Sequence, residues 1–334
     1  MNAGFSEFLK ATPQDRRDVF LNAAARLGTP EQYVEKDFWV TWTLDVLFNG
    51  LPTGHPRFLF KGGTSLSKAY GLISRFSEDI DITVFREDLG QAVSVPELEA
   101  MSRKKRQARL DAIKNACRDY IQNTLARQFT EIAQQAFADS NIEPNDPTIA
   151  VDSDDPDGQS LLFWYPTVTT RHGDYIRPAV KIESGAKSAL DPHDELRIVP
   201  YVSEDVPRLR LAAAGVTTVV AERTFWDKII ILHGVRNWFE RRGVLRGQGQ
   251  RVSRHYYDAH RIFQSGTRPT RCRRPCTCRG LRGSCPHVLQ QSGPRPRWRG
   301  SWNLLSVGDR SNARRVAPRL RQNDWNDHRR TAGV

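Results

Sequence analysis

The stretch that decides the fold is KGGTSLSKAYGLISRFSEDIDI, residues 61–82. Residues 57–61, RFLFK, are short and apolar, which is typical of a buried strand, and Gly62-Gly63 ends that strand. A short helix is predicted over residues 64–72, with Thr64 or Ser65 as its N-cap. Residues 79–84 alternate between polar and apolar side chains, which predicts a second strand. The stretch therefore predicts a strand, a glycine turn, a short helix and a strand.

This unit gathers groups that suit phosphate and a metal ion. The glycine pair leaves the backbone open, and the following helix N-terminus offers N–H groups together with the hydroxyls of Thr64 and Ser65. Asp79 and Asp81 are two residues apart on a strand, so their carboxylates share one face. Such a pair is costly unless a cation lies between its members, and Mg²⁺ prefers oxygen ligands. A glycine pair alone is usually a turn and a lone Asp-x-Asp is usually surface charge, but the combination is far more specific.

Outside this unit, the periodicity of residues 1–266 predicts an α+β fold. We expect a small mixed β-sheet flanked by helices, with N-terminal helices in residues 1–50, the core with a helical insertion in 51–200, and C-terminal helices in 201–266. Helices are predicted over residues 13–27, 30–48, 98–138, 217–233 and 251–264, strands over 161–169 and 176–184, and a polar loop over 139–160.

The charge is unevenly distributed along the 334 residues. The formal net charge is +12, yet residues 267–334 hold 16 Arg and 3 Asp with no Lys or Glu, and residues 1–266 carry a net charge of −1. That balance argues against a basic nucleic-acid-binding protein without catalysis. No apolar run reaches the roughly 20 residues of a membrane span, and the first residues lack a secretory signal pattern. The expected location is the cytoplasm, with no membrane partner.

Residues 267–334 have three possible interpretations. They could be a basic arm that binds nucleic acid. Cys272, Cys276, Cys278 and Cys285 with His287 could bind zinc, but their spacing lacks paired C-x2-C knuckles. The third interpretation, which the composition favours, is translation of a shifted reading frame after about residue 266, because GC-rich genes read out of frame yield Arg, Pro, Gly, Ser and Cys. A shifted-frame tail should be disordered and bind no zinc, and it should leave apolar surface exposed on residues 217–264.

The central stretch resembles the DNA polymerase β-type nucleotidyltransferases, and within them the AbiEii/AbiGii toxin family, which includes the MenT toxins. GGT-x-LS and RFSEDID are similar to that family's glycine turn and acidic pair. The resemblance covers roughly residues 30–264. Four further segments carry it: EKDFWV at residues 35–40, VKIESGA at 180–186, ERTFWDK at 222–228 and SRHYYD at 253–258.

The resemblance implies roles for individual residues. Asp79 and Asp81 would be Mg²⁺ ligands, and Glu183 is the candidate third acidic residue, although an edge-strand charge is the alternative. Lys181 lies on the same face as Glu183 and could approach a triphosphate. Asp227 and Lys228 would be catalytic or nucleotide-positioning residues, unless they only mark a helix boundary. The nucleotide-binding candidates are Lys61, Gly62, Gly63, Thr64 and Ser65. Arg75 and Ser77 would brace the acidic pair, and Arg254 and Asp258 would be supporting residues that could instead pair with each other.

The implied activity is Mg²⁺-dependent nucleotidyl transfer from a nucleoside triphosphate to RNA, with a tRNA 3′ end as the expected acceptor. The resemblance further implies the toxin half of a toxin–antitoxin pair, a cognate antitoxin protein and abortive phage defence. The alternative is an inactive, frame-shifted relic of such a toxin. The glycine pair, the acidic pair and Glu183 should line one pocket, and the basic run from Arg103 to Arg106 should lie on the surface, where it could contact RNA phosphates.

Overall fold

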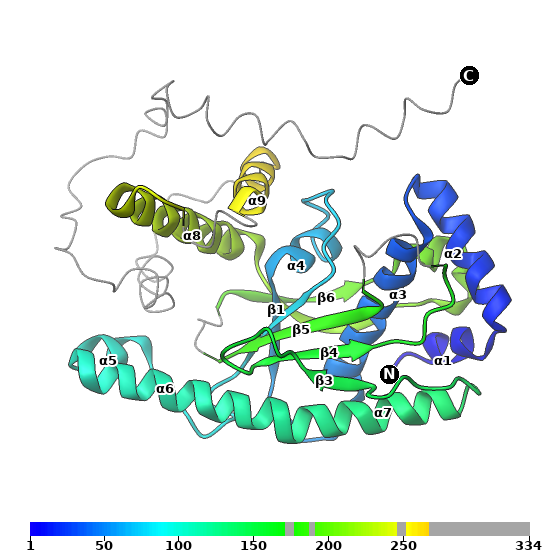
Figure 1. Ribbon diagram of the computed structural model, residues 1–334, viewed down its shortest axis with the longest axis horizontal. Helices are drawn as coiled ribbons and strands as arrows, with labels where there is room; N and C mark the ends of the chain where they lie inside the picture. The colour runs from blue at the N-terminus through cyan, green and yellow to red at the C-terminus, as the bar shows by residue number, and fades with distance from the viewer. Residues whose placement is uncertain (171–176, 187–190, 246–251, 267–334) are drawn as a thin grey trace.

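The computed structural model describes residues 1–170, 177–186, 191–245 and 252–266. Within these residues the chain forms a seven-stranded mixed sheet of order β3-β4-β5-β2-β1-β7-β6 (Figure 1). This arrangement confirms the predicted α+β class and mixed sheet. The strands are β1 (Phe58–Lys61), β2 (Ile80–Val84), β3 (Ile149–Val151), β4 (Ser160–Trp164), β5 (Ala179–Gly185), β6 (His193–Ile198) and β7 (Ala213–Val219).

The centre of the sheet is formed by the predicted strand–turn–helix–strand unit. Strand β2 pairs antiparallel with β1 and parallel with β5, and β1 pairs parallel with β7. The short helix α4 (Gly62–Lys68) follows β1 directly, because Gly62-Gly63 breaks the strand. The two central strands and the helix between them thus place residues 61–82 in the middle of the molecule.

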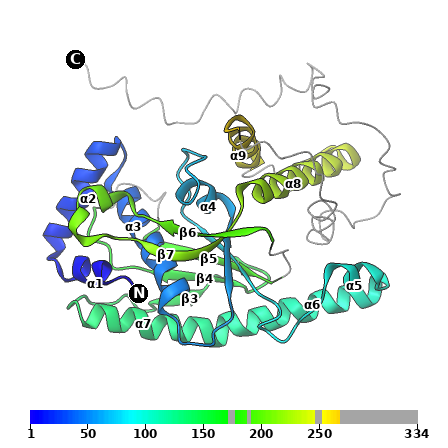
Figure 2. The same cartoon turned by 180° about the vertical axis from the view of Figure 1, so that it is seen from behind.

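One face of the sheet carries the main hydrophobic core. Phe58, Phe60, Ile80 and Ile82 are buried there, because alternate residues of a strand point to the same face. The helices that contribute to this core are α1 (Ala3–Lys10), α2 (Pro13–Leu27), α3 (Glu31–Asp45), α6 (Arg103–Asp119) and α7 (Ala126–Ala138). Helices α6 and α7 run along one side of the sheet, and α4, α8 (Ala221–Arg242) and α9 (Val252–Gln264) lie on the other (Figure 1 and Figure 2).

Aromatic side chains fill the centre of this core. Trp42 stacks on Phe163 of β4 with ring centroids 5.3 Å apart, and Trp39 stacks on Tyr165 at 5.4 Å. Each large apolar side chain that is fully buried contributes about 1.5–3 kcal/mol to stability. The apolar positions of α3, predicted as part of a helix over residues 30–48, therefore fix that helix against the sheet.

A second, smaller core joins α4 to the pair α8 and α9. Leu66 of α4, Phe225 of α8 and Ile262 of α9 belong to it, together with Ile73, Ala221 and Ala259. Large apolar side chains nevertheless stay exposed on and after these two helices: Phe239, Val244, Leu245, Tyr256 and Phe263. Exposed apolar surface was predicted for residues 217–264 as a consequence of a shifted frame; single side chains are exposed there, as they are at Leu21 and Val151, so the cause stays a prediction.

The helix predicted over residues 98–138 is interrupted. Helix α5 (Val95–Ala100) ends before Ser102, whose side chain caps α6 by accepting a hydrogen bond from the Lys105 N–H. A π-helical segment, η2 (Tyr120–Leu125), then joins α6 to α7, and a similar one, η1 (Val46–Gly50), follows α3. Arg103, Lys104 and Lys105 are exposed and Arg106 is half-buried, so the basic run lies on the surface as predicted.

Three strands and one helix were not predicted. Strand β7 includes residues 217–219, which were assigned to a helix; that prediction was wrong, since the β-branched run Val216 to Val219 pairs with β6 instead. Strand β3 lies within the predicted polar loop, and the polar strand β6 gave no clear pattern. Helix α1 was missed although Phe5, Phe8 and Leu9 have helical spacing. Two short 3₁₀ helices, η3 (Tyr201–Glu204) and η4 (Pro207–Leu209), complete the described elements.

Within the described ranges, no helix has the length and apolar character that crossing a membrane requires. The predictions for the Arg-rich segment, including its disorder and the zinc alternative, concern residues 267–334 and lie outside the described residues. The division at residues 50, 200 and 266 stays a prediction.

Candidate active site

Three ionisable side chains form a row across the centre of the sheet. In the register of β1, β2 and β5, Lys61 lies opposite Asp81, and Asp81 lies opposite Glu183. Directly opposed residues on neighbouring strands point to the same face, and Asp79 precedes β2 by one residue. That face is the one opposite Ile80 and Ile82, which are buried in the main core. Asp81 and Glu183 therefore share one face of the sheet, although the predicted common pocket with the glycine pair stays a prediction.

The glycine pair comes very close to the acidic pair. Gly62 has φ of +84°, and a Cβ atom added there would overlap the Asp81 carboxylate. A Cβ atom on Gly63 would overlap the Arg75 guanidinium and lie 2.9 Å from Ser77 Oγ. Both positions thus exclude any side chain, Gly62 also because of its backbone conformation. The N-cap of α4 is Lys61, whose side chain makes no capping hydrogen bond; the prediction of Thr64 or Ser65 as N-cap was wrong, because both lie inside the helix.

The hydroxyls of Thr64 and Ser65 are turned inward. Thr64 Oγ1 lies 2.9 Å from Ser77 Oγ and donates to the Asp79 carbonyl oxygen, and Ser65 Oγ donates to the Gly62 carbonyl oxygen at 3.0 Å. Both side chains are fully buried. The expectation that these hydroxyls face a phosphate is not met; instead they fix the turn, and Ser77 braces Asp79 through Thr64.

Negative charge is concentrated around Asp81. Burial raises the pKa of Asp81 to about 7; Lys61 and Lys228 oppose the shift, and the charges of Glu183 and Asp79 add to it. A divalent cation would offset this excess charge, so the donor set fits Mg²⁺. No group of three or more Asp, Glu, His or Cys ligands occurs among the described residues. Asp79 and Asp81 would provide two carboxylates, and substrate phosphates would complete the coordination.

The Lys181 ammonium lies between two carboxylates. Its Nζ is 2.8 Å from Glu183 Oε1 and 3.0 Å from Asp152 Oδ2. Burial alone would lower the pKa of Lys181, but its hydrogen bonds and attraction to Glu183 and Asp152 outweigh burial and raise it. Lys181 thus stays charged and compensates Glu183. Asp152 was missed in the sequence because it lies in the acidic loop 152–157, where nothing distinguishes it from its neighbours.

Helix α8 supplies a positive charge above the acidic pair. Lys228 is buried and lies close enough to Asp81 that its charge lowers the pKa of that carboxylate. Asp227 pairs with Arg223 at 3.4 Å, one helical turn earlier. Burial raises the pKa of Asp227, while Arg223 and Lys61 oppose the shift. The sequence analysis did not identify Arg223, although its i,i+4 spacing from Asp227 indicates an ion pair on one helix face.

Asp258 of α9 binds two cations that come from other elements. Its carboxylate accepts two hydrogen bonds from Arg75, both at 2.8 Å, and lies 2.9 Å from Lys228 Nζ. Burial would raise the pKa of Asp258, but the Arg75 hydrogen bonds and the Lys228 charge lower it. The alternative that Asp258 pairs with Arg254 was wrong, because the carboxylate is fully buried and faces Arg75 and Lys228 instead.

Glu35, Lys36 and Asp37 of α3 each contact another segment, and the contacts of Lys36 and Asp37 adjoin the acidic pair and the glycine turn. Glu35 accepts hydrogen bonds from the hydroxyls of Thr167 and Thr169, and Lys36 lies 2.7 Å from Glu78, next to Asp79. Asp37 forms a buried ion pair with Lys68 of α4, at a nitrogen–oxygen distance of 2.6 Å. The sequence marked this segment as a motif but indicated no role for it.

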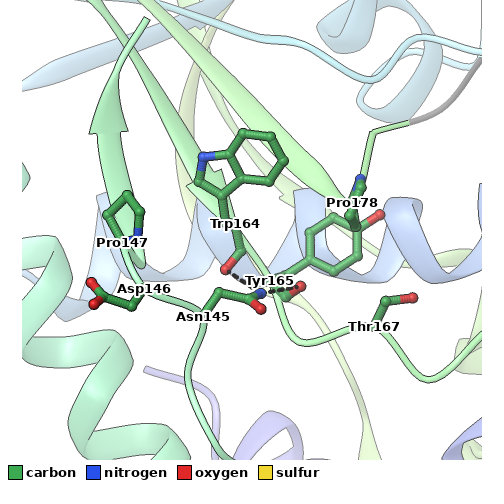
Figure 3. A pocket seen from close by; sticks show the side chains of 7 residues that line it. All are labelled: Asn145, Asp146, Pro147, Trp164, Tyr165, Thr167 and Pro178. Atoms are coloured by element: carbon green, nitrogen blue, oxygen red, sulfur yellow. Dashed lines mark hydrogen bonds between the residues drawn. The ribbon is translucent and has the colours of Figure 1, made fainter. Parts of the chain in front are cut away.

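A cavity of about 260 Å³ lies away from these residues (Figure 3). Asn145 lies at its wall and donates hydrogen bonds to the carbonyl oxygens of Trp164 and Tyr165. Trp164 pairs with Ala179 at one end of the β4–β5 ladder, and Ser160 pairs with Glu183 at the other. The cavity is thus separate from the acidic row, and the pocket that was predicted to contain the glycine pair and the carboxylates is not this one.

A family profile and a solved structure are similar to this chain. The profile of the family described as "Nucleotidyl transferase AbiEii toxin, Type IV TA system" matches residues 45–305. A solved structure, the MenT4 nucleotidyltransferase toxin Rv2826c from Mycobacterium tuberculosis H37Rv, is similar with a TM-score of 0.35 and 16% identity, over 65% of this chain and 59% of that one. This chain therefore spans less than two thirds of MenT4. No curated protein gives a significant match.

The matched range differs from the expected one at both ends. The motifs predicted a resemblance from about residue 30 to residue 264, whereas the profile begins at residue 45 and continues to residue 305. It includes residues 61–82, 180–186, 222–228 and 253–258, which carry the acidic row, α8 and α9. Because the profile matches well over half of the chain, this protein belongs to the AbiEii nucleotidyltransferase toxin family.

Proposed function

We propose that this chain transfers a nucleotide from a nucleoside triphosphate to an RNA hydroxyl, with a tRNA 3′ end as acceptor. The observation that carries the proposal is the row of Lys61, Asp81 and Glu183 directly beside the glycine turn. A carboxylate and a guanidinium that lie directly against a glycine turn suit a metal-bound triphosphate. Family membership supports the reaction class, and the acceptor follows from the sequence resemblance.

Asp79 and Asp81 are the residues that would hold Mg²⁺. When bound, Mg²⁺ would neutralise the charge that builds up on the phosphoryl oxygens during transfer. Around that position Lys61 and Lys228 supply positive charge, since both lower the pKa of Asp81. We assign the binding of the triphosphate to these two lysines and to the backbone N–H groups at Gly62 and Gly63.

The proposed step is an in-line displacement at the α-phosphorus. A bond forms between the acceptor hydroxyl oxygen and the α-phosphorus, and the bond from that phosphorus to the bridging oxygen of the β-phosphate breaks. Pyrophosphate leaves with the electron pair, and the hydroxyl proton passes to solvent water. The protein needs no covalent nucleophile, because positioning and charge stabilisation account for most catalysis of this type.

The biological setting is part of the same proposal. Family membership supports action as a toxin whose targets lie in the cytoplasm and whose activity is opposed by a cognate antitoxin. An inactive, frame-shifted relic would differ from this proposal only in that it transfers no nucleotide to RNA. The alternative of a non-catalytic basic protein predicts RNA binding without any use of triphosphate.

The test measures where the α- and γ-phosphates of the nucleoside triphosphate are found after the reaction. The purified chain is incubated with a tRNA pool, MgCl₂ and each of the four nucleoside triphosphates, labelled at either the α- or the γ-phosphate. We expect the α-label in RNA and the γ-label in pyrophosphate. Transfer of the γ-label to RNA would show a kinase reaction and contradict the proposal, and the absence of both products would favour the inactive relic.

A further inference from the structure

The buried contacts between α9 and the glycine turn extend the proposed function. Asp258 is fully buried and lies 183 residues after Arg75, yet it accepts two parallel hydrogen bonds from that guanidinium. A bidentate pair of this kind fixes orientation as well as position, because the planar guanidinium matches the carboxylate. The same carboxylate lies 2.9 Å from Lys228 Nζ of α8. One anion thus binds two cations from separate segments.

Both cations face the site assigned to the triphosphate. Arg75 fills the space next to Gly63, where a Cβ atom would overlap its guanidinium. Lys228 lies within electrostatic reach of Asp81, since its charge lowers the pKa of that carboxylate. The two cations would repel each other without the carboxylate between them. Their positions at the glycine turn and at the acidic pair therefore depend on Asp258.

Two further contacts hold α9 against the same segment. The Tyr257 hydroxyl accepts a hydrogen bond from the Ser74 N–H at 3.2 Å. Ala259 and Ile262 pack in the small core with Leu66 and Ile73. These contacts keep α9 docked by means other than Asp258, so the helix has anchors that remain when the carboxylate is changed. Loss of the Asp258 charge can then be separated from loss of docking.

We infer that Asp258 is a positioning residue: it orients Arg75 and Lys228 so that both can bind the phosphates of the nucleoside triphosphate. The inference rests on the proposed function. Asp258 touches neither the acidic row nor the glycine pair in the described contacts, and it acts through the two cations. Helix α9 is accordingly a part of the nucleotide site, although it lies outside the sheet that carries the carboxylates (Figure 1).

The test compares Asp258→Asn with a matched variant of the neighbouring residue, Tyr257→Phe. Asp258→Asn keeps the size of the side chain and removes its charge, whereas Tyr257→Phe removes one contact to the same segment and leaves both cations paired. Equilibrium binding of labelled nucleoside triphosphate is measured without RNA. We expect Asp258→Asn to weaken binding about tenfold or more, which corresponds to about 1.4 kcal/mol, and Tyr257→Phe to change it less than about twofold.

A double-mutant cycle separates positioning from general support of the fold. In a Lys228→Met background one of the two oriented cations is gone, so the effect of Asp258→Asn on triphosphate binding should shrink at least threefold. An equal loss in both backgrounds would mean that Asp258 only stabilises α9, and would overturn the inference. If Asp258→Asn does not fold, Asp258→Glu replaces it, because the longer side chain keeps the charge and displaces it by one methylene.

The outcomes also distinguish this inference from the proposed function. Wild-type protein that binds triphosphate but transfers nothing to RNA overturns the proposed transfer, and the binding cycle still decides the role of Asp258. Wild-type protein that binds no triphosphate overturns both. In active protein, Asp258→Asn should raise the KM for triphosphate and leave the KM for RNA unchanged; equal effects on both constants would also contradict the inference.

Discussion

Replacement of Gly62 by alanine tests the close approach of the turn to the acidic pair. Gly62 has φ of +84°, where alanine is strained by about 1–2 kcal/mol, and its new methyl group would overlap the Asp81 carboxylate. Either the turn or the carboxylate must then move by about 1 Å. Misplacement on that scale can reduce a rate about 100-fold. We expect Gly62→Ala to lose about 1–3 kcal/mol of stability and about 100-fold in transfer rate.

Gly54 provides a matched control for the backbone strain alone. Its φ is +87°, and no atom lies within 4 Å of an added Cβ. Gly54→Ala should therefore lose the same 1–2 kcal/mol, a shift in Tm of roughly 2–8 °C, with little change in rate. Thermal unfolding followed by circular dichroism and turnover of labelled triphosphate measure the two effects. Similar rates for the two variants would refute the argument that Gly62 sets the position of Asp81.

Three further predictions concern other parts of the chain. Neutralising the basic run with glutamine at Arg103, Lys104 and Lys105 should flatten the salt dependence of RNA binding by about 0.7 in slope for each RNA phosphate that the protein no longer neutralises; an unchanged slope means that the run is only a solvated face. Lys68→Met should lower the free energy of unfolding in urea by about 3–5 kcal/mol, because it leaves Asp37 charged and buried, while Lys10→Met at an exposed position should change it by less than about 0.5 kcal/mol. Sequencing the coding DNA tests the frame shift expected near residue 266, which the continuation of the family profile to residue 305 opposes. Shifted by one nucleotide, the back-translation of residues 323–333 permits Met-Thr-Gly-Met-Ile-Thr-Gly-Glu-Pro-Pro, which fits the ending M-x-x-M-I-x-G-E-P-P that the resemblance implies; a gene without such a reading in the alternate frame would dismiss the shift.

The central strands could be predicted because local patterns agree with the tertiary structure there. Alternation over residues 79–84 and the break at Gly62-Gly63 both reflect the fold directly. Strand β7 could not be separated from the following helix, since Thr217 to Val219 adjoin Ala221 without a glycine or proline between them. Strand β6 is mostly exposed and polar, so it carries no apolar periodicity.

The candidate site likewise has a part that local sequence patterns predicted and a part that they could not predict. Strand spacing predicted that Asp79 and Asp81 share a face, and the resemblance added Glu183 as a candidate for the same site. Neither could show that β2 and β5 are neighbours, which places Glu183 opposite Asp81. The partners of Asp258 could not be predicted: local spacing favoured Arg254, but the helix turns that carboxylate toward Arg75, which is 183 residues away. Contacts at such separation depend on docking of α9 through the small core.

The most direct test of the central claim is transfer of α-labelled nucleotide to tRNA by the wild type and by Asp81→Ala, with Asp79→Ala beside it. Glu195→Ala is the control, because Glu195 is an exposed carboxylate on β6. We predict Mg²⁺-dependent labelling of the tRNA 3′ end by the wild type and the control, and none by either aspartate variant. Asp81→Ala should stay folded, since burial already disfavours the charged form of Asp81. Full activity of Asp81→Ala would contradict the account.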